Sequence, residues 1–267
     1  MLRFRCFRGW VALFAGVVFS YSPHVHANIF SVNPIHIYLT SKSTSSLLTV
    51  HNDSSEVLRF QVTVSAWDES PKGESILTPT QDIIFFPALM TVGPGQERKI
   101  RVGTVNPTPA QEKTYRIFVQ ELPPEQKPNQ SKQNVYMRVL TRMAIPIFQE
   151  PESMQSTVAL EDLSIANGKF LFNLKNPGNA HFIPQKIHVK AISAKGAAVI
   201  DKDLPAWYVL AGHLRAYDID VPKAVCASIQ SFKIRVELEG KTVEKTYETK
   251  GGACGPPKSV PSSSPSP

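Results

Sequence analysis

The sequence predicts an all-β protein built from two sandwich domains in tandem. Short segments in which apolar and polar residues alternate recur along the chain, and a period of two is typical of strands that bury one face. Turn residues separate these segments, and no long segment has a helical period with capping residues. The length fits two domains of about 100 to 130 residues better than one. Alternating segments include Phe60–Ser65, Lys99–Val102, Arg116–Gln120, Phe170–Lys175 and Lys233–Leu238.

The first 27 residues have the features of a secretion signal. Three arginines precede a short apolar stretch at residues 10–19, and Val25-His26-Ala27 offers a cleavage site. The apolar stretch is too short to cross a bilayer, which takes about 20 residues. We therefore expect residues 1–27 to be a signal peptide and the mature chain to begin at Asn28.

The charge of the chain gives no sign of a nucleic-acid or membrane-surface partner. The formal charge of +7 falls to +4 once the three arginines of the leader are removed, and the remaining basic residues are scattered. No segment after the leader is long and apolar enough to span a membrane. We therefore expect a mature protein that is soluble outside the cytoplasm and is not inserted in the membrane.

Polar segments that contain proline divide the mature chain. Gln149–Ser153 is the expected boundary, with a first domain at residues 28–150 and a second at residues 151–255. Leu122–Gln133 is a long polar loop with three prolines, and we expect it to be mobile. Residues 256–267 are rich in proline and serine and have almost nothing apolar to bury, so we expect a disordered tail.

Cys226 and Cys254 are the two cysteines that remain when Cys6 leaves with the signal. An even pair of cysteines in an exported chain predicts a disulfide bond. Neither cysteine has a second cysteine or a histidine at metal-ligand spacing, so we expect no zinc site.

The sequence shows no catalytic constellation. It has no nucleophile elbow, no glycine-rich phosphate loop and no His-Glu-x-x-His motif. Asp218 and Asp220 share one face of an expected strand, but without a partner they are best explained as a solvated face. The histidines of the mature chain are dispersed at His36, His51, His181, His188 and His213. We expect a protein that is not an enzyme and that carries no metal or other cofactor.

The segment Asn134–Phe148 is the most informative feature of the chain. It is longer than an ordinary strand needs, and one of its faces is almost entirely apolar. Such a strand is either buried on both faces in a sandwich core or exposed at a sheet edge, where it binds another chain by adding a strand. The apolar face carries Val135, Met137, Val139, Thr141, Met143, Ile145 and Ile147.

Eight further segments, read in order, carry a resemblance to a known family. They are Ser31–Leu39, Leu48–Asn52, Ala66–Trp67, Phe85–Pro87, Val92–Val102, Tyr115–Pro124, Asn176–His181 and Trp207–Gly212. Each segment is short, but their order and spacing are specific and cover most of the mature chain. The pattern resembles the PapD-like family, the periplasmic chaperones of the chaperone–usher pathway, and it is closer to the archaic or alternative branch.

The resemblance implies both a fold and a function. The fold is two immunoglobulin-like β-sandwich domains in tandem. Members of the family bind pilus or fimbrial subunits that lack their last strand, insert a long strand of their own by donor-strand complementation, and deliver the subunit to an outer-membrane usher. By position, the donor residues here are Val135, Met137, Val139 and Thr141, in a protein located in the periplasm.

The sequence departs from the family at the residues that anchor the subunit. Well-studied members hold the subunit's C-terminal carboxylate with an Arg on the first strand and a Lys on the last. Here the aligned positions are His36 and Pro146. Arg142 is the nearest basic residue on the long strand, and Arg138 and Arg116 are further candidates. We expect the carboxylate anchor to be Arg142 or His36, and the alternative is that no residue of a cleft holds the carboxylate.

Two other classes of function are consistent with exported sandwiches. One is a secreted immunoglobulin-like adhesin or structural pilus subunit, and the other is an exported enzyme on a sandwich fold. A subunit should have an incomplete domain or a free N-terminal extension, whereas this chain starts its first strand soon after Asn28 and has two complete domains by its pattern. An enzyme should show a nucleophile, a base or a metal cluster.

The processing of the chain gives a first testable prediction. Periplasmic material should begin at Asn28 and contain a Cys226–Cys254 disulfide, because the leader has the regions of a signal peptide and the mature cysteines are paired in number. Intact mass with and without a reductant measures both features. A chain that retains Cys6, or that has two free thiols, would contradict the prediction.

Overall fold

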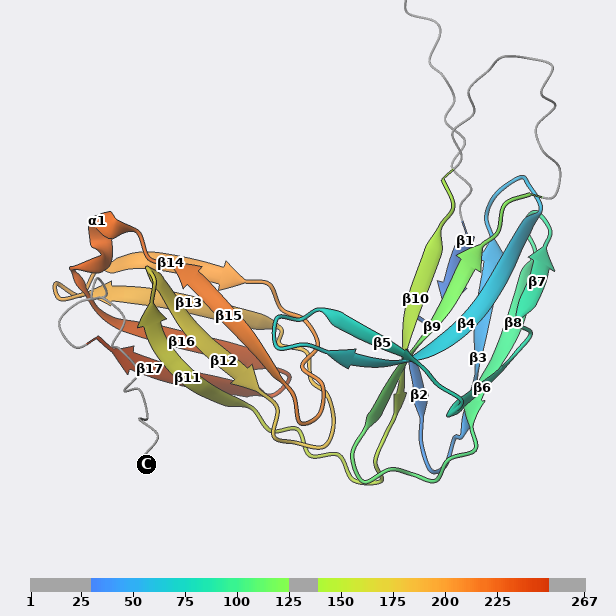
Figure 1. The fold of residues 1–267 in the computed structure, drawn as a ribbon, viewed down its shortest axis with the longest axis horizontal. Helices are drawn as coiled ribbons and strands as arrows, with labels where there is room; N and C mark the ends of the chain where they lie inside the picture. The colour runs from blue at the N-terminus through green and yellow to red at the C-terminus, as the bar shows by residue number, and fades with distance from the viewer. Residues whose placement is uncertain (1–29, 125–138, 250–267) are drawn as a thin grey trace, which may run out of the picture.

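The computed structural model describes residues 30–124 and 139–249, and nearly all of its regular elements are strands (Figure 1). The first half has β1 Phe30–Asn33, β2 Ile37–Leu39, β3 Ser45–Asn52, β4 Leu58–Glu69, β5 Ser75–Pro79, β6 Ile83–Phe86, β7 Leu89–Val92, β8 Glu97–Thr104, β9 Lys113–Glu121 and β10 Arg142–Gln149. The second half has β11 Ala159–Ala166, β12 Lys169–Lys175, β13 Lys186–Ser193, β14 Ala198–Leu204, β15 Leu214–Asp220, the short helix α1 Lys223–Cys226, β16 Ile229–Leu238 and β17 Lys241–Glu248. The all-β prediction is confirmed.

Strands β1 to β10 form the first sandwich. Its smaller sheet has the order β1-β3-β8-β6, and its larger sheet has the order β2-β10-β9-β4-β5, with β7 also paired to β4. Alternate side chains of each strand point into the space between the sheets, because successive side chains of a strand lie on opposite faces. The buried core includes Leu48, Val50, Ile100 and Val102 from the smaller sheet and Phe60, Val62, Ile117, Val119, Ile145 and Ile147 from the larger.

Strands β11 to β17 form the second sandwich. One sheet has the order β11-β12-β15, and the other has the order β14-β13-β16-β17. The rings of Phe170 on β12 and Phe232 on β16 stack across the core with their centroids 4.0 Å apart. The protein therefore has two β-sandwich domains in tandem. The predicted boundary at residues 149–153 falls between β10 and β11, while the limits of each domain stay a prediction.

The two sandwiches meet at an aromatic joint. Phe148, near the end of β10, is fully buried, and its ring stacks on the imidazole of His181 with 3.9 Å between centroids. Trp67 and Tyr208 pack against the same ring. Glu112 has a fully buried side chain and accepts hydrogen bonds from the backbone N–H and the Nδ1 atom of His181. These contacts tie the second domain to one end of the larger sheet.

The hairpin of β4 and β5 makes a second connection between the domains. In Figure 1 this hairpin extends from the larger sheet toward the second sandwich. The backbone N–H of Ala216 donates to the carbonyl of Pro71 at 2.8 Å, and Arg215 pairs with Glu69 at 3.2 Å. The larger sheet of the first domain is therefore the one whose outer face turns toward the second domain.

The long predicted strand divides into two parts. Ile145 and Ile147 are buried in the first sandwich, so the core interpretation holds for this half of the segment. Val139 precedes β10 and is 71% exposed. Val135 and Met137 lie outside the described residues.

Other expectations also fall outside the described part of the chain. The signal peptide at residues 1–27, the tail at residues 256–267 and Cys254 are among them, so the disulfide stays a prediction. Cys226 lies in α1, a helix that the sequence did not predict, and it is buried. Among the described residues, no helix is both long and apolar enough to cross a membrane.

The joint gives a stability prediction. Phe148→Ala should lower the free energy of unfolding by about 3–5 kcal/mol, because it removes a large buried ring and leaves a cavity between the domains. Phe86→Ala is the matched control, since Phe86 is 76% exposed and its loss should change stability by no more than about 0.5 kcal/mol. Urea denaturation measures both variants. Equal effects of the two substitutions would show that Phe148 does not support the joint.

Candidate functional site

The outer face of the larger sheet carries side chains in rows that cross β4, β9 and β10. In the antiparallel register Arg116 of β9 lies opposite Ser65 of β4 and Pro146 of β10, and Phe118 lies opposite Ala144. Residues directly opposite each other on neighbouring strands point to the same face. The row of Arg116 and Pro146 therefore lies on the outer face, between the domain joint and the start of β10.

The backbone of β10 has an edge that the described strands leave partly open. The Glu121 N–H donates to the Thr141 carbonyl at 2.9 Å, so the odd-numbered residues of β10 turn their backbone groups toward β9. The even-numbered residues turn theirs to the other side. There, among the described strands, β2 pairs only with residues 147–149. The N–H groups of Arg142 and Ala144 thus face an edge without a described partner, and Pro146 has no N–H.

The predicted donor residues stand at the start of this edge. Val139 and Thr141 are odd-numbered, like the core residues Ile145 and Ile147 of β10. They precede the strand, however, and the sandwich core no longer covers them there. Val139 is exposed and Thr141 is half-buried. The structure therefore brings two of the four predicted donor residues to an open sheet edge, and Val135 and Met137 lie outside the described residues.

The two predicted anchor residues lie in different surroundings. The guanidinium of Arg142 lies 3.9 Å from the ring centroid of Phe118, and its side chain is exposed. His36 Nε2 lies 2.6 Å from the Tyr208 hydroxyl, so His36 joins the first domain to the second. Arg138 lies outside the described residues. The structure does not bring Arg142 and His36 together, because Arg142 lies opposite Gln120 at the far end of β10.

Arg116 is the basic residue in the same row as Pro146. Its guanidinium lies 4.0 Å from the ring centroid of Trp67. Burial lowers the pKa of Arg116, whereas the nearby Glu69 and Tyr208 act in the opposite direction. Arg116 is therefore a cation that has lost part of its hydration and stands close to the domain joint.

Two tyrosines complete this end of the outer face. Tyr38 of β2 stacks on Phe148, with centroids 5.5 Å apart, and Tyr208 comes from the second domain. Burial raises the pKa of Tyr208, and Arg116 partly offsets this effect. Burial also raises the pKa of Tyr38, as do the carboxylates of Glu150 and Glu112. Both phenols therefore stay protonated and can donate hydrogen bonds at neutral pH.

A charged cluster lies behind Arg116 at the joint. Burial raises the pKa of Glu69, and the facing Arg215 counteracts the shift. Within the described residues, Trp67 Nε1, Glu69 Oε1 and Arg215 Nε are buried without a hydrogen-bond partner. The joint is thus a place where polar groups have been removed from water and only partly paired.

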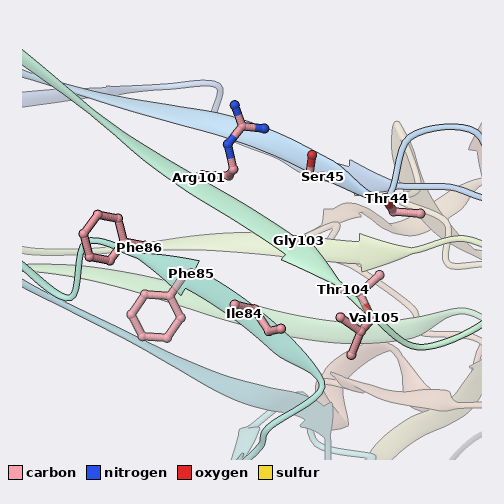
Figure 2. Close-up of a pocket in the computed structure, with 9 residues that line it drawn as sticks. All are labelled: Thr44, Ser45, Ile84, Phe85, Phe86, Arg101, Gly103, Thr104 and Val105. Carbon is pink, nitrogen blue, oxygen red and sulfur yellow. The ribbon is translucent and has the colours of Figure 1, made fainter.

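A separate apolar hollow of about 220 Å³ lies on the smaller sheet, over β6 and β8 (Figure 2). Gly103 lies opposite Ser45 and Ile84 across this sheet, so the β8 position between these two residues has no side chain to fill the hollow. Phe86 and Val105 are strongly exposed there, and Arg101 is the one charged residue of the lining. The hollow is on the opposite side of the first sandwich from the outer face of the larger sheet.

The chemistry of the outer face is that of a binding surface. Its described features are an open backbone edge, exposed apolar side chains, two arginines stacked on rings and a phenol beside an imidazole. The described residues hold no group of three or more metal-ligating side chains placed to bind an ion. The arrangement can pair with an extended chain and bind an anion.

One known protein family matches the first half of the chain. Residues 29–155 match the family described as "Pili and flagellar-assembly chaperone, PapD N-terminal domain". The first sandwich belongs to this family of PapD-like chaperone domains. The match spans all the strands of the first sandwich, including β2, β9 and β10, which build the candidate site. A search of the curated proteins by sequence finds no match for this chaperone.

Solved chaperone structures share the fold at low sequence identity. The Class 5 fimbriae chaperone CfaA is 16% identical over 83% of this chain and 100% of its own, with a TM-score of 0.53. A chain of the Salmonella enterica SafA pilin–SafB chaperone complex is 15% identical over 84% of this chain and 98% of its own, with a TM-score of 0.53. A chain of the Acinetobacter baumannii CsuC–CsuE complex is 18% identical over 72% and 90%, with a TM-score of 0.51.

Sequence reasoning missed part of the site of this chaperone. The sequence places Tyr208 only in the segment Trp207–Gly212, whereas in the structure its hydroxyl meets His36 across the joint. For Tyr38 the sequence indicates only a place in the first strand. Arg116 was one candidate among three, and nothing in the sequence placed it in the row of Pro146. The register between β9 and β10 was the missing information.

Proposed function

We propose that this PapD-like chaperone acts in the periplasm, where it binds pilus or fimbrial subunits by adding a strand at the open edge of β10. The observation that carries the proposal is the edge itself, where the N–H groups of Arg142 and Ala144 face no described strand. Relatives of the same fold were solved with a pilin and with a tip adhesion subunit, as the SafA–SafB and CsuC–CsuE structures state. Delivery to an outer-membrane usher would follow.

The donor residues would supply the side-chain part of the binding energy. Val135, Met137, Val139 and Thr141 alternate on one face, so an added strand would place them all toward the core of the bound subunit. Burial of each apolar side chain would contribute about 1.5–3 kcal/mol. The backbone ladder would fix the register, because a slip by one residue turns every side chain to the other face.

A basic residue near the edge would bind the terminal carboxylate of the subunit. His36 and Arg142 are the two residues that the sequence proposes for this role, one at each end of the described edge. We propose no catalytic step and no cofactor for the protein, since binding and release of a subunit require only reversible contacts.

Replacing a donor residue tests the proposed function. Val139→Asp should weaken the binding of a pilin subunit by about a hundredfold or more, which is ~2.7 kcal/mol, because the subunit groove would have to bury an unpaired carboxylate. The measurement is the amount of subunit that co-purifies from the periplasm, followed by titration of the purified proteins. The variant itself should stay folded, since Val139 is 71% exposed in the free chaperone.

Val105→Asp is the matched control. Val105 is also strongly exposed, but it lies on the smaller sheet, away from β10. Equal loss of binding in both variants would point to a general effect of the added charge. Normal binding by a folded Val139→Asp chaperone would show that this segment is not the donor strand.

A further inference from the structure

The outer face of the smaller sheet has an apolar end that the described residues leave uncovered. Ile84 and Phe86 of β6 and Val105, which follows β8, are exposed around the hollow of about 220 Å³ (Figure 2). Scattered exposed apolar side chains are normal, but a group of them around one hollow indicates an interaction site. This face belongs to the sheet that does not contain β10, so the surface is separate from the proposed donor strand.

The hollow lies where β8 carries no side chain. Gly103 stands between Ser45 of β3 and Ile84 of β6, as Figure 2 shows, and the space above it is open. A volume of 220 Å³ is smaller than the ~300–1,000 Å³ that is usual for small-molecule pockets. The hollow therefore fits one apolar side chain of a larger partner better than it fits a whole small-molecule ligand.

Arg101 adds a positive charge to this apolar end. In the register of the sheet it lies between Leu47 and Phe86, which are both exposed. Within the part of the chain that the structure describes, its guanidinium has no ion pair and no hydrogen bond. A guanidinium has five N–H donors in a planar fork that matches a carboxylate, so Arg101 can bind an acidic group of a partner.

The acids close to Arg101 in the fold already have partners of their own. Glu97, on the same face of β8, pairs with Lys99 at 3.6 Å. Asp82, the residue before β6, accepts a hydrogen bond from the Tyr115 hydroxyl at 2.8 Å. The counter-charge for Arg101 would therefore come from another molecule, and charge complementarity favours an acidic partner.

The spacing of the hollow and the charge matches an extended chain. Gly103 and Arg101 are two residues apart on β8, which corresponds to about 7 Å, and they face the same side. Side chains two residues apart in an extended partner have the same spacing and also share a side. Such a segment, lying along β8, would place an apolar side chain over Gly103 and a carboxylate on the guanidinium of Arg101.

We propose that the outer face of the smaller sheet, at Gly103 and Arg101, docks an extended segment of a partner protein in which an aromatic or branched apolar residue stands two positions from an aspartate or glutamate. The inference goes beyond the proposed function and does not depend on strand addition, because β10 belongs to the other sheet. The chaperone would thus be able to hold this partner while its donor strand is occupied.

NMR titration of the isotope-labelled, full mature chaperone tests the proposal residue by residue. The probe is a peptide of about eight residues, blocked at both ends, with serine and threonine around a central Phe-Thr-Glu. The amide signals of Gly103 and Ile84 should shift and saturate with a Kd of about 1 mM or tighter. A peptide with glutamine in place of the glutamate should bind at least about fivefold more weakly, because it loses the charge-assisted pair. A peptide with alanine in place of the phenylalanine should lose at least as much.

Two arginine variants identify the residue that binds the carboxylate. Arg101→Gln should remove the preference for the glutamate peptide while binding the glutamine peptide as the wild type does. Arg98→Gln is the matched control, because Arg98 is also an exposed arginine of β8 without an ion pair in the described residues. It lies an odd number of positions from Arg101 and so faces the other side of the strand. This variant should keep the preference.

The same titrations contain the outcomes that would overturn the proposal. A preference that survives in Arg101→Gln, or that disappears in Arg98→Gln, would overturn the role of Arg101. Shifts confined to β10, or no saturable shift at Gly103, would overturn the docking surface. Binding of 3-phenylpropionate as tightly as the peptide would assign the hollow to small amphipathic anions. Shifts that grow with chaperone concentration alone would assign it to a second copy of the chain, and both results would contradict a partner segment.

Discussion

The backbone N–H and C=O groups along one edge of β10 need hydrogen-bond partners, and the rest of this structure depends on how that need is met. A sheet edge with unpaired N–H and C=O groups beside apolar side chains is a template for another strand, and soluble proteins normally cover it. Here β2 covers only the last residues of β10, from Ile147 on. Pro146 marks the limit of this cover, and its missing N–H ends the row of donors that a second chain could use. Among the described strands, none pairs with the edge of β10 before Pro146.

The domain joint places the second sandwich beside the end of that edge that β2 covers. Phe148 is the residue just beyond Pro146 on the same face, and its ring is held between Tyr38, Trp67, His181 and Tyr208. The same contacts that bury Phe148 bring Tyr208 to His36 and leave Arg116 half-buried beside Trp67. Packing of the domains and the polar character of the site therefore come from one cluster of side chains. A change in the joint would alter the site without touching β10.

Much of the fold follows from local patterns in the sequence. Alternation such as that of Phe170, Phe172 and Leu174 defines strands, and these residues are buried as the period of two predicts. The apolar run of Asn134–Phe148 pointed to the special strand, but its pattern alone could not say where the core stops covering it. That limit depends on how far the opposite sheet extends, which is a tertiary property. Val139 and Ile145 look alike in the sequence, yet one is exposed and the other is buried.

The site was harder to predict, because its residues meet through register and through the joint. Arg116 and Pro146 are neighbours only in the register of β9 and β10, and His36 and Tyr208 are 172 residues apart in the chain. No local pattern carries this information. The alignment with the family pointed to Pro146, and the structure shows that the cation of this row stands on the neighbouring strand.

Amide hydrogen exchange with and without a bound strand tests the central claim most directly. The probe is a free-acid peptide of about twelve residues in which valine and threonine alternate, and the exchange of single β10 amides is followed by NMR. The account predicts slower exchange at Arg142 and Ala144, whose N–H groups face the open edge, and little change at Met143 and Ile145, which already pair with β9. Unchanged exchange at Arg142 and Ala144 in the saturated complex, or protection confined to β6 on the smaller sheet, would contradict it.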